Sequence, residues 1–328
     1  MRLGRTLAAK AVVWLNALKR VPMSQPQHAS ASPPPSNLPP FDTFLMRERS
    51  RARVSDFHPR YPFAVGRGPA AGQLRTDDPN SPFGHEPELA HLLDRLVPDD
   101  GVFLDVGSNY GYFSIFLATR PNFRGRIHAF EPIARSFAGL RDLVHALQCD
   151  QFVTCHQAAA SDANGTISME VASDPGLSRI VDGNTVNGET VERMQLDSLD
   201  VDRVDFIKMD VEGHEASALR GADAVLRKRR PFIFLESWAF DAQPDKVFEA
   251  LRLLVAHGYR LYLPAWAQSN GTFFVGVGPS HEMRTLALVP FNLEDRLTFP
   301  GNPINIFASP TSREDELGEP WAARFRTT

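Results

Sequence analysis

The sequence predicts an α/β fold built on a doubly wound, mostly parallel sheet with an antiparallel pair of strands at one edge. Short apolar runs with strand character alternate with longer segments in which apolar residues recur at helical spacing. This alternation is typical of parallel strands joined by crossover helices, because the helices cover both faces of the sheet. The expected elements are a strand at 102–106, a helix at 111–119, a strand at 126–130, a helix at 133–147, a strand at 152–159, a hairpin at 166–171, a strand at 204–209, a helix at 215–228, a strand at 232–236 and a helix at 244–257.

Other segments complete the predicted fold. An amphipathic helix over 86–96 precedes the first strand and stops at the Pro-Asp-Asp-Gly run of 98–101. Residues 259–263 and 271–277 have strand character and are expected to form the antiparallel edge pair. Residues 172–195 are polar and rich in Gly, Asn and Asp, which predicts a loop or insertion on the substrate side of the sheet.

Composition divides the chain into four parts. Residues 1–40 are basic, contain no acid and end in a Pro/Ser-rich linker that cannot pack a core. Residues 41–100 lead into the first strand, residues 101–309 hold the alternating elements, and residues 310–328 form a charged C-terminal tail. The first twenty residues have three interpretations: a tether with a short amphipathic helix, a helix on a membrane surface or partner, and a cleaved targeting peptide.

Whole-chain properties exclude several classes of protein. The net charge of −4 predicts no nucleic-acid partner. Two cysteines, Cys149 and Cys155, make no disulfide framework and fit a reduced compartment. No apolar run is long enough for a spanning helix, and the P-loop, zincin and serine-hydrolase motifs are absent. We therefore expect a cytoplasmic protein, with peripheral membrane contact left open by the N-terminal segment.

The stretch VFLDVGSNYGYFSIF, residues 102–116, is a strand that ends in a glycine-bearing turn and opens a helix. The turn contains Asp105, Gly107, Asn109 and Gly111. Its spacing is not the G-x-G-x-x-G that seats a pyrophosphate, and an acid would repel a phosphate. It suits a cationic or amino-bearing ligand, such as the aminocarboxypropyl sulfonium of S-adenosylmethionine.

Three further motifs follow at the ends of later strands. Glu131 ends the second strand, where an acid accepts hydrogen bonds from free ribose hydroxyls. Asp162 lies in a turn closed by Asn-Gly; it could accept the exocyclic amine of an adenine, or simply cap the turn. The segment VDFIKMDVEGHE, residues 204–215, ends a buried-type strand in a cluster of acids and one histidine, at the edge where open α/β sheets bind ligands.

In these residues the sequence resembles the FkbM-type S-adenosylmethionine-dependent methyltransferases. The matching stretches are DVGSNYGYFS (105–114), FEP (130–132), SDANG (161–165), LDSL (196–199) and KMDVEGHEASALRGA (208–222). Ser108 replaces the usual alanine. The resemblance implies a Rossmann-like fold of the class I methyltransferase type, S-adenosylmethionine as methyl donor, and O-methylation of a hydroxyl on a sugar, glycolipid or secondary metabolite. The expected partner is a small-molecule or glycan acceptor.

We assign the donor site to Asp105, Gly107, Asn109, Gly111 and Glu131, with Asp162 near the adenine. The predicted catalytic residues are Asp210, His214 and Glu236, which stand at the ends of the fourth and fifth parallel strands.

Each catalytic prediction has a competing interpretation. His214 is the only imidazole of the cluster and could act as the base, or be a solvated residue that opens a helix. Asp210, Glu212 and Glu215 could bind a divalent cation, or act as ordinary partners of a helix N-terminus. A non-catalytic methyltransferase-like binding module is the alternative function, whereas a nicotinamide dehydrogenase fails on the glycine spacing.

Overall fold

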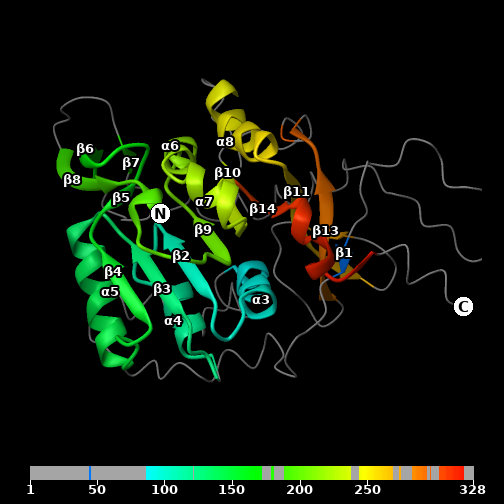
Figure 1. Ribbon diagram of the computed structural model, residues 1–328, viewed down its shortest axis with the longest axis horizontal. Helices are drawn as coiled ribbons and strands as arrows, with labels where there is room; N and C mark the ends of the chain where they lie inside the picture. Colours follow the sequence, from blue (N-terminus) through cyan, green and yellow to red (C-terminus); the bar gives the residue numbers. More distant parts are fainter. Residues whose placement is uncertain are drawn as a thin grey trace, which may run out of the picture.

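A mixed sheet forms the centre of the structure (Figure 1). The computed structural model describes residues 44–45, 86–120, 122–171, 179–180, 188–237, 244–268, 273–274, 283–293, 296 and 303–320. Within these residues the sheet has 11 strands in the order β15-β1-β13-β11-β14-β10-β9-β2-β3-β4, with β12 paired to β11. The strands are β1 (Phe44–Leu45), β2 (Val102–Val106), β3 (Arg126–Phe130), β4 (Val153–His156), β9 (Phe206–Met209), β10 (Phe232–Ser237), β11 (Tyr259–Gln268), β12 (Phe273–Phe274), β13 (Met283–Phe291), β14 (Ile304–Pro310) and β15 (Glu319–Pro320).

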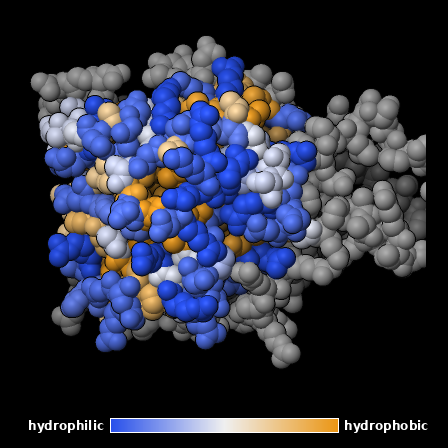
Figure 2. All heavy atoms as spheres, viewed as in Figure 1, coloured by the Kyte–Doolittle hydropathy of each residue, from blue (hydrophilic) through white to orange (hydrophobic). Residues whose placement is uncertain are grey.

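Helices cover both faces of this sheet. The α-helices are α3 (Pro87–Leu96), α4 (Tyr112–Ala118), α5 (Ala134–Ala146), α6 (Glu215–Arg220), α7 (Asp223–Lys228) and α8 (Pro244–Ala256). Helices α3, α4 and α5 share one apolar cluster with the sheet, and α6, α7 and α8 share another. On the face seen in Figure 2, apolar side chains gather over the parallel strands and the surrounding surface is mostly hydrophilic. None of the described helices is long and apolar enough to cross a membrane.

The parallel half of the sheet confirms the predicted doubly wound α/β fold. Strand β2 lies between β3 and β9, with β4 and β10 as the next parallel neighbours on either side. The chain moves outward from β2 through β3 to β4, then resumes on the other side with β9. Strands β2 and β9 therefore form the topological switch point, beyond whose carboxyl ends such sheets bind ligands.

The antiparallel half is larger than the edge pair that we expected from residues 259–263 and 271–277. Strand β14 pairs antiparallel with β10, and β11 pairs with both β14 and β13. Of the second expected strand, the described residues Phe273–Phe274 form β12, which pairs antiparallel with β11. The antiparallel pairing of these two segments is thus confirmed, but β11 is not an edge strand, because β13 pairs with it and the buried apolar β14 lies between it and β10.

A small second sheet stands where the sequence predicted one long strand, a hairpin and a loop. It has the order β5-β8-β6-β7, with β5 (Ala159–Ala160), β6 (Gly165–Glu170), β7 (Arg179–Ile180) and β8 (Gly188–Met194). The strand predicted at 152–159 divides into β4 and β5, and the loop predicted at 172–195 contains β7 and β8. The sequence pattern does not indicate strand β8, because most of its side chains are polar and exposed or half-buried, and Val191 is its one buried residue.

The helix predicted at 215–228 divides into α6 and α7. At the break, a Cβ on Gly221 would lie 1.9 Å from the carbonyl oxygen of Ser161, so the backbones of the two segments touch. The 3-10 helix η4 (Leu196–Ser198) supplies Asp197, whose carboxylate accepts the backbone N–H groups of Ala224 and Val225, each at 2.9 Å. These bonds cap α7 from a distant segment, which local helical spacing does not reveal.

Segments before and after the parallel strands pack on the sheet. On α3, the buried Glu88 accepts a hydrogen bond from the indole N–H of Trp266 in β11 (2.6 Å). The 3-10 helix η6 (Thr311–Glu316) places the Arg313 guanidinium 4.0 Å from the ring centre of Phe232, and Leu317 is fully buried. Residues 311–317, within the segment expected to be a tail, therefore contact the sheet.

Glu88 generates a prediction about stability. Burial raises the pKa of Glu88 from 4.5 to about 7, so between these values the folded chain holds a proton that the unfolded chain releases, and stability falls as the pH rises. Glu88→Gln keeps the acceptor oxygen and removes the charge. The free energy of unfolding of this variant, relative to that of the unaltered chain, should therefore increase by roughly 1–3 kcal/mol from pH 5 to pH 8, as measured by urea unfolding.

Glu88→Ala is the control for this prediction. It loses the bond to Trp266 and leaves a void, so it should be less stable at both pH values. A gain for Glu88→Gln that is the same at pH 5 and pH 8 would contradict a buried, titrating carboxyl.

Candidate active site

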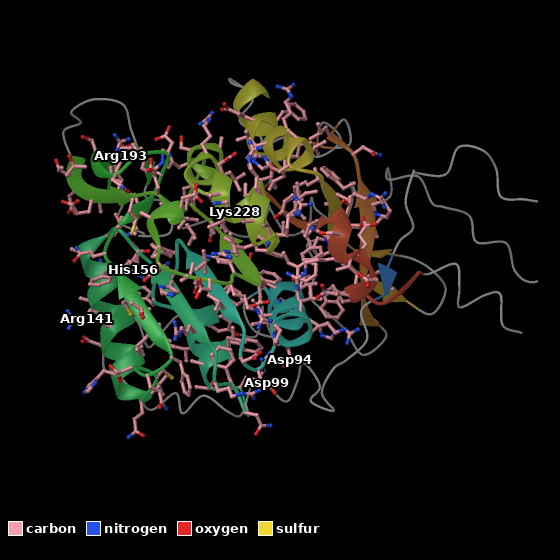
Figure 3. The ribbon with its side chains drawn as sticks, viewed as in Figure 1. Asp94, Asp99, Arg141, His156, Arg193 and Lys228 are labelled. Carbon is pink, nitrogen blue, oxygen red and sulfur yellow. The ribbon has the colours of Figure 1, made fainter. Side chains whose placement is uncertain are left out.

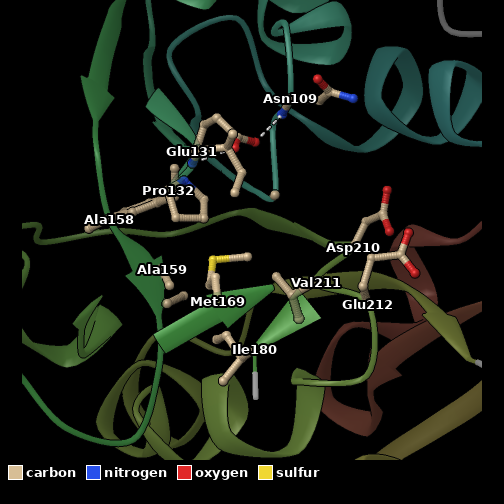
Figure 4. A pocket seen from close by; sticks show the side chains of 14 residues that line it. Asn109, Glu131, Pro132, Ala158, Ala159, Met169, Ile180, Asp210, Val211 and Glu212 are labelled. Carbon is tan, nitrogen blue, oxygen red and sulfur yellow. Dashed lines mark hydrogen bonds between the residues drawn. The ribbon is translucent and has the colours of Figure 1, made fainter. Parts of the chain in front are cut away.

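One cavity opens beyond the carboxyl ends of β2, β3 and β9 (Figure 4). Its volume, open mouth included, is about 610 Å³. Figure 4 shows apolar side chains such as Pro132, Met169 and Ile180 along one part and the carboxylates of Asp210 and Glu212 along another. The lining residues are Gly107, Asn109, Phe130, Glu131, Pro132, Ile133, Ala158, Ala159, Ala160, Met169, Ile180, Asp210, Val211 and Glu212.

The cavity brings together four residues that the sequence predicted for the site, namely Gly107, Asn109, Glu131 and Asp210. They come from the turn after β2, the tip of β3 and the end of β9. Parallel strands at a switch point place their carboxyl ends side by side, so these residues meet although up to 103 positions separate them.

The glycines of the turn are required by close contacts within the protein. Gly107 has a φ of 74°, and a Cβ there would lie 1.8 Å from the carbonyl oxygen of Asp210. Gly111 has a φ of 83°, and a Cβ there would lie 2.3 Å from a methyl group of Leu140 in α5. Gly107 lines the cavity and Gly111 does not. Both glycines let the turn pack against neighbouring elements.

Asp105 is buried behind the cavity wall and does not line it. Its Oδ2 accepts hydrogen bonds from the backbone N–H (3.1 Å) and the hydroxyl (2.6 Å) of Ser114 in α4. Its Oδ1 lies 3.9 Å from the Nζ of Lys208. Burial raises the pKa of Asp105, and Lys208 opposes that shift. Any influence of Asp105 on a ligand therefore passes through α4 and Lys208.

Glu131 joins the tip of β3 to the turn after β2. Its Oε2 accepts the backbone N–H of Asn109 (2.9 Å) and its Oε1 accepts that of Ile133 (2.8 Å). Burial raises the pKa of Glu131 from 4.5 to about 7, against the lowering effect of these bonds. Asn109 has a φ of 50°, and its buried side-chain oxygen accepts no hydrogen bond from the described residues.

Three carboxylates gather at the other part of the cavity. Oxygen atoms of Asp210, Glu212 and Glu236 all lie within 4.8 Å of one another, a spacing that could hold a divalent cation. Glu236, at the end of β10, thus joins Asp210 as the sequence predicted. Glu215 does not belong to this group: its Oε1 accepts the backbone N–H of Gly213 (3.1 Å), and burial raises its pKa to about 7.

His214 and Asp162 do not line the cavity. The Nε2 of His214 lies 3.0 Å from the hydroxyl of the buried Ser161, so the imidazole ties the start of α6 to the segment after β5. Asp162 forms an ion pair with Arg193 (3.7 Å), which Figure 3 places on the small sheet. The proposed roles of His214 as base and Asp162 as adenine partner stay predictions.

Sequence reasoning missed residues both in the cavity wall and behind it. Met169 and Ile180 belong to the small sheet, whose apolar side packs on Ile133. Lys208 stands in the middle of the apolar run of β9, and a single charged residue in a buried strand was the available signal.

The strand order defines the class of fold: a doubly wound α/β domain with its cavity at the switch point, as in class I methyltransferases. Residues 105–261 match the family model described as "Methyltransferase FkbM domain". This match over residues 105–261 confirms the resemblance noted in the sequence.

Individual proteins resemble parts of the chain. A curated relative, "Hexuronic acid methyltransferase AglP" of Haloferax volcanii, is 28% identical over 146 residues, which are 43% of this chain and 58% of the relative. A solved FkbM methyltransferase from Methylobacillus flagellatus is 19% identical, with a TM-score of 0.39, over 58% of this chain and 44% of that one. An O-methyltransferase from Bacillus cereus, solved in complex with SAH, is 16% identical, with a TM-score of 0.39, over 67% and 86% of the two chains.

The buried carboxyl of Glu131 generates a prediction about ligand binding. An ionised carboxylate accepts hydrogen bonds from ribose hydroxyls, and a pKa of about 7 leaves most of Glu131 protonated at pH 6. Affinity for S-adenosylhomocysteine should therefore rise from pH 6 to pH 8, by about five- to tenfold, in isothermal titration.

Glu131→Gln is the matched variant for this prediction, because it has the same shape and does not titrate. Its affinity should be lower and nearly independent of pH over this range. An equal pH dependence in both proteins would assign the titration to another group.

Proposed function

We propose that this chain is an S-adenosylmethionine-dependent methyltransferase that transfers a methyl group to a hydroxyl of a sugar-type acceptor. The observation that carries the proposal is the meeting of Gly107, Asn109, Glu131 and Asp210 in one cavity at the switch point of the sheet. The family of the domain agrees with this chemistry.

The residues of the cavity fit S-adenosylmethionine. The apolar part, with Pro132, Ile133 and Met169, suits an adenine ring. The carboxylate of Glu131 has lone pairs left for ribose hydroxyls after it has accepted two backbone N–H groups. The side-chain oxygen of Asn109 is buried and accepts no bond from the described residues, and a turn of this side chain toward the cavity would let it accept the amino group of the methionine part.

The mechanism needs little covalent chemistry from the protein. When bound, S-adenosylmethionine would supply the methyl group of its sulfonium: the acceptor oxygen would bond to the methyl carbon as the carbon–sulfur bond breaks, S-adenosylhomocysteine would leave, and the hydroxyl proton would pass to a neighbouring base. The chain must orient both reactants and exclude water. Asp210 follows the end of β9 at the switch point, where it can accept a hydrogen bond from the acceptor hydroxyl. Glu236 can orient the same molecule. Carboxylates of this kind suit an acceptor rich in hydroxyl groups.

The acceptor class is the finer part of the proposal. It has support from a curated relative named as a hexuronic acid methyltransferase, although the chain spans only 58% of that protein's length. Three carboxylates would repel an acidic sugar, so a divalent cation among Asp210, Glu212 and Glu236 would assist its binding.

Donor binding provides the first test of this function. In isothermal titration the chain should bind S-adenosylmethionine and S-adenosylhomocysteine but not NAD. Glu131→Ala should weaken S-adenosylhomocysteine binding at least about tenfold, because it removes charge-assisted hydrogen bonds worth ~1.5–3 kcal/mol each. Glu192→Ala, an exposed change on β8, is the control and should bind like the unaltered chain. Tighter binding of NAD would contradict the assignment.

Turnover provides the second test. With labelled donor and a panel of neutral and acidic glycans, Asp210→Asn should lower the rate tenfold or more and leave donor affinity nearly unchanged, because Asp210 faces the acceptor. The exposed Asp202→Asn should be without effect. Activity that a chelator abolishes and a divalent cation restores would assign the carboxylates to a metal. Wild-type turnover in Asp210→Asn would move the chemistry elsewhere.

A further inference from the structure

Lys208 is a buried cation between the two parts of the candidate site. It occupies the third position of β9, where its neighbours in the strand are apolar, and only 5% of its surface is exposed. Its Nζ donates a hydrogen bond to the carbonyl oxygen of Gly107 (2.6 Å) and lies 3.3 Å from the Oδ2 of Asp210. It also lies 3.9 Å from the Oδ1 of Asp105, which accepts no hydrogen bond from the described residues.

The surrounding carboxylates keep this lysine charged. Burial by itself would lower the pKa of Lys208, but Asp210 and Asp105 outweigh the burial and the pKa is raised. Glu86, ahead of α3, acts in the same direction. A buried ammonium of this kind is stable only with such partners.

The contacts of Lys208 reach both sides of the cavity. The Gly107 carbonyl belongs to the turn expected to hold the donor, and the Asp210 carboxylate faces the expected place of the acceptor. Lys208 is not among the lining residues, so it acts on a ligand through these two groups. An ammonium offers three donors to oxygens on different segments, which no apolar residue of the strand could do.

We propose that Lys208 is a positioning residue that holds the donor turn and the Asp210 carboxylate in one fixed arrangement. The inference rests on the proposed donor site and adds a residue to it. A lysine that served the fold alone would affect stability and leave the affinity of the folded protein for ligand unchanged.

The test compares three variants by isothermal titration with S-adenosylhomocysteine and by thermal unfolding. Lys208→Met keeps the length of the side chain and removes both charge and donors; it should bind at least tenfold more weakly. Lys208→Arg restores the charge and the donors and should recover most of the affinity. Lys208→Gln keeps a donor without the charge and should lie between them.

Arg120→Met is the matched control, because Arg120 is also a mostly buried cation that donates to a backbone carbonyl, that of Val97 (2.8 Å). It pairs with Asp99, which Figure 3 places at the end of the molecule remote from the small sheet. This variant should lose stability and keep its affinity for S-adenosylhomocysteine.

The outcomes separate the two proposals. If the unaltered chain does not bind S-adenosylhomocysteine, the proposed function fails and this inference fails with it. If the unaltered chain and folded Lys208→Met bind equally well, only the inference about Lys208 is overturned. Failure of all three Lys208 variants to fold would assign this residue to the fold alone and would also overturn the inference.

Discussion

The contact between the turn after β2 and the end of β9 is the constraint on which the rest of the structure depends. The carbonyl of Asp210 occupies the space of a side chain at position 107, so only glycine permits the two strands to end this close together. The same approach puts the Gly107 carbonyl within reach of Lys208 and the Asp210 carboxylate at the cavity wall. Fold and candidate site therefore share one set of atoms, and a change that separates the strands would damage both.

The two parts of the cavity have different structural origins. Its polar part comes from the strand ends of the central sheet, which any doubly wound fold places together. Its apolar wall depends on Met169 and Ile180, which the small second sheet brings against Ile133 and Ala159. The polar part therefore follows from the architecture, whereas the apolar wall is specific to the segment between β4 and β9. Differences in ligand preference between proteins of this fold should arise mainly in such segments.

The sequence predicted the features that local pattern encodes. The strands at 102–106 and 126–130 and the strand-end residues Glu131 and Asp210 lie where their motifs indicated. Features that depend on distant partners were not predictable in this way. Strand β8 forms by pairing with β6, and helix α7 begins where the carboxylate of Asp197 accepts its first backbone N–H groups. The position of β14 is determined by its pairing with β10 and β11. In the sequence, Lys208 is one charged residue in an apolar strand. The structure shows the three oxygen atoms that surround its ammonium group.

The position of β14 has a consequence for how the chain is made. This strand lies between β10 and β11, yet it follows both of them in the sequence by more than 35 residues. During synthesis, which proceeds from the N-terminus, β10 and β11 leave the ribosome before the strand that joins them exists. Until residue 310 emerges, each presents an unpaired edge able to bind a foreign strand. The chain thus completes its sheet late, and the matched segment 105–261 cannot close it alone.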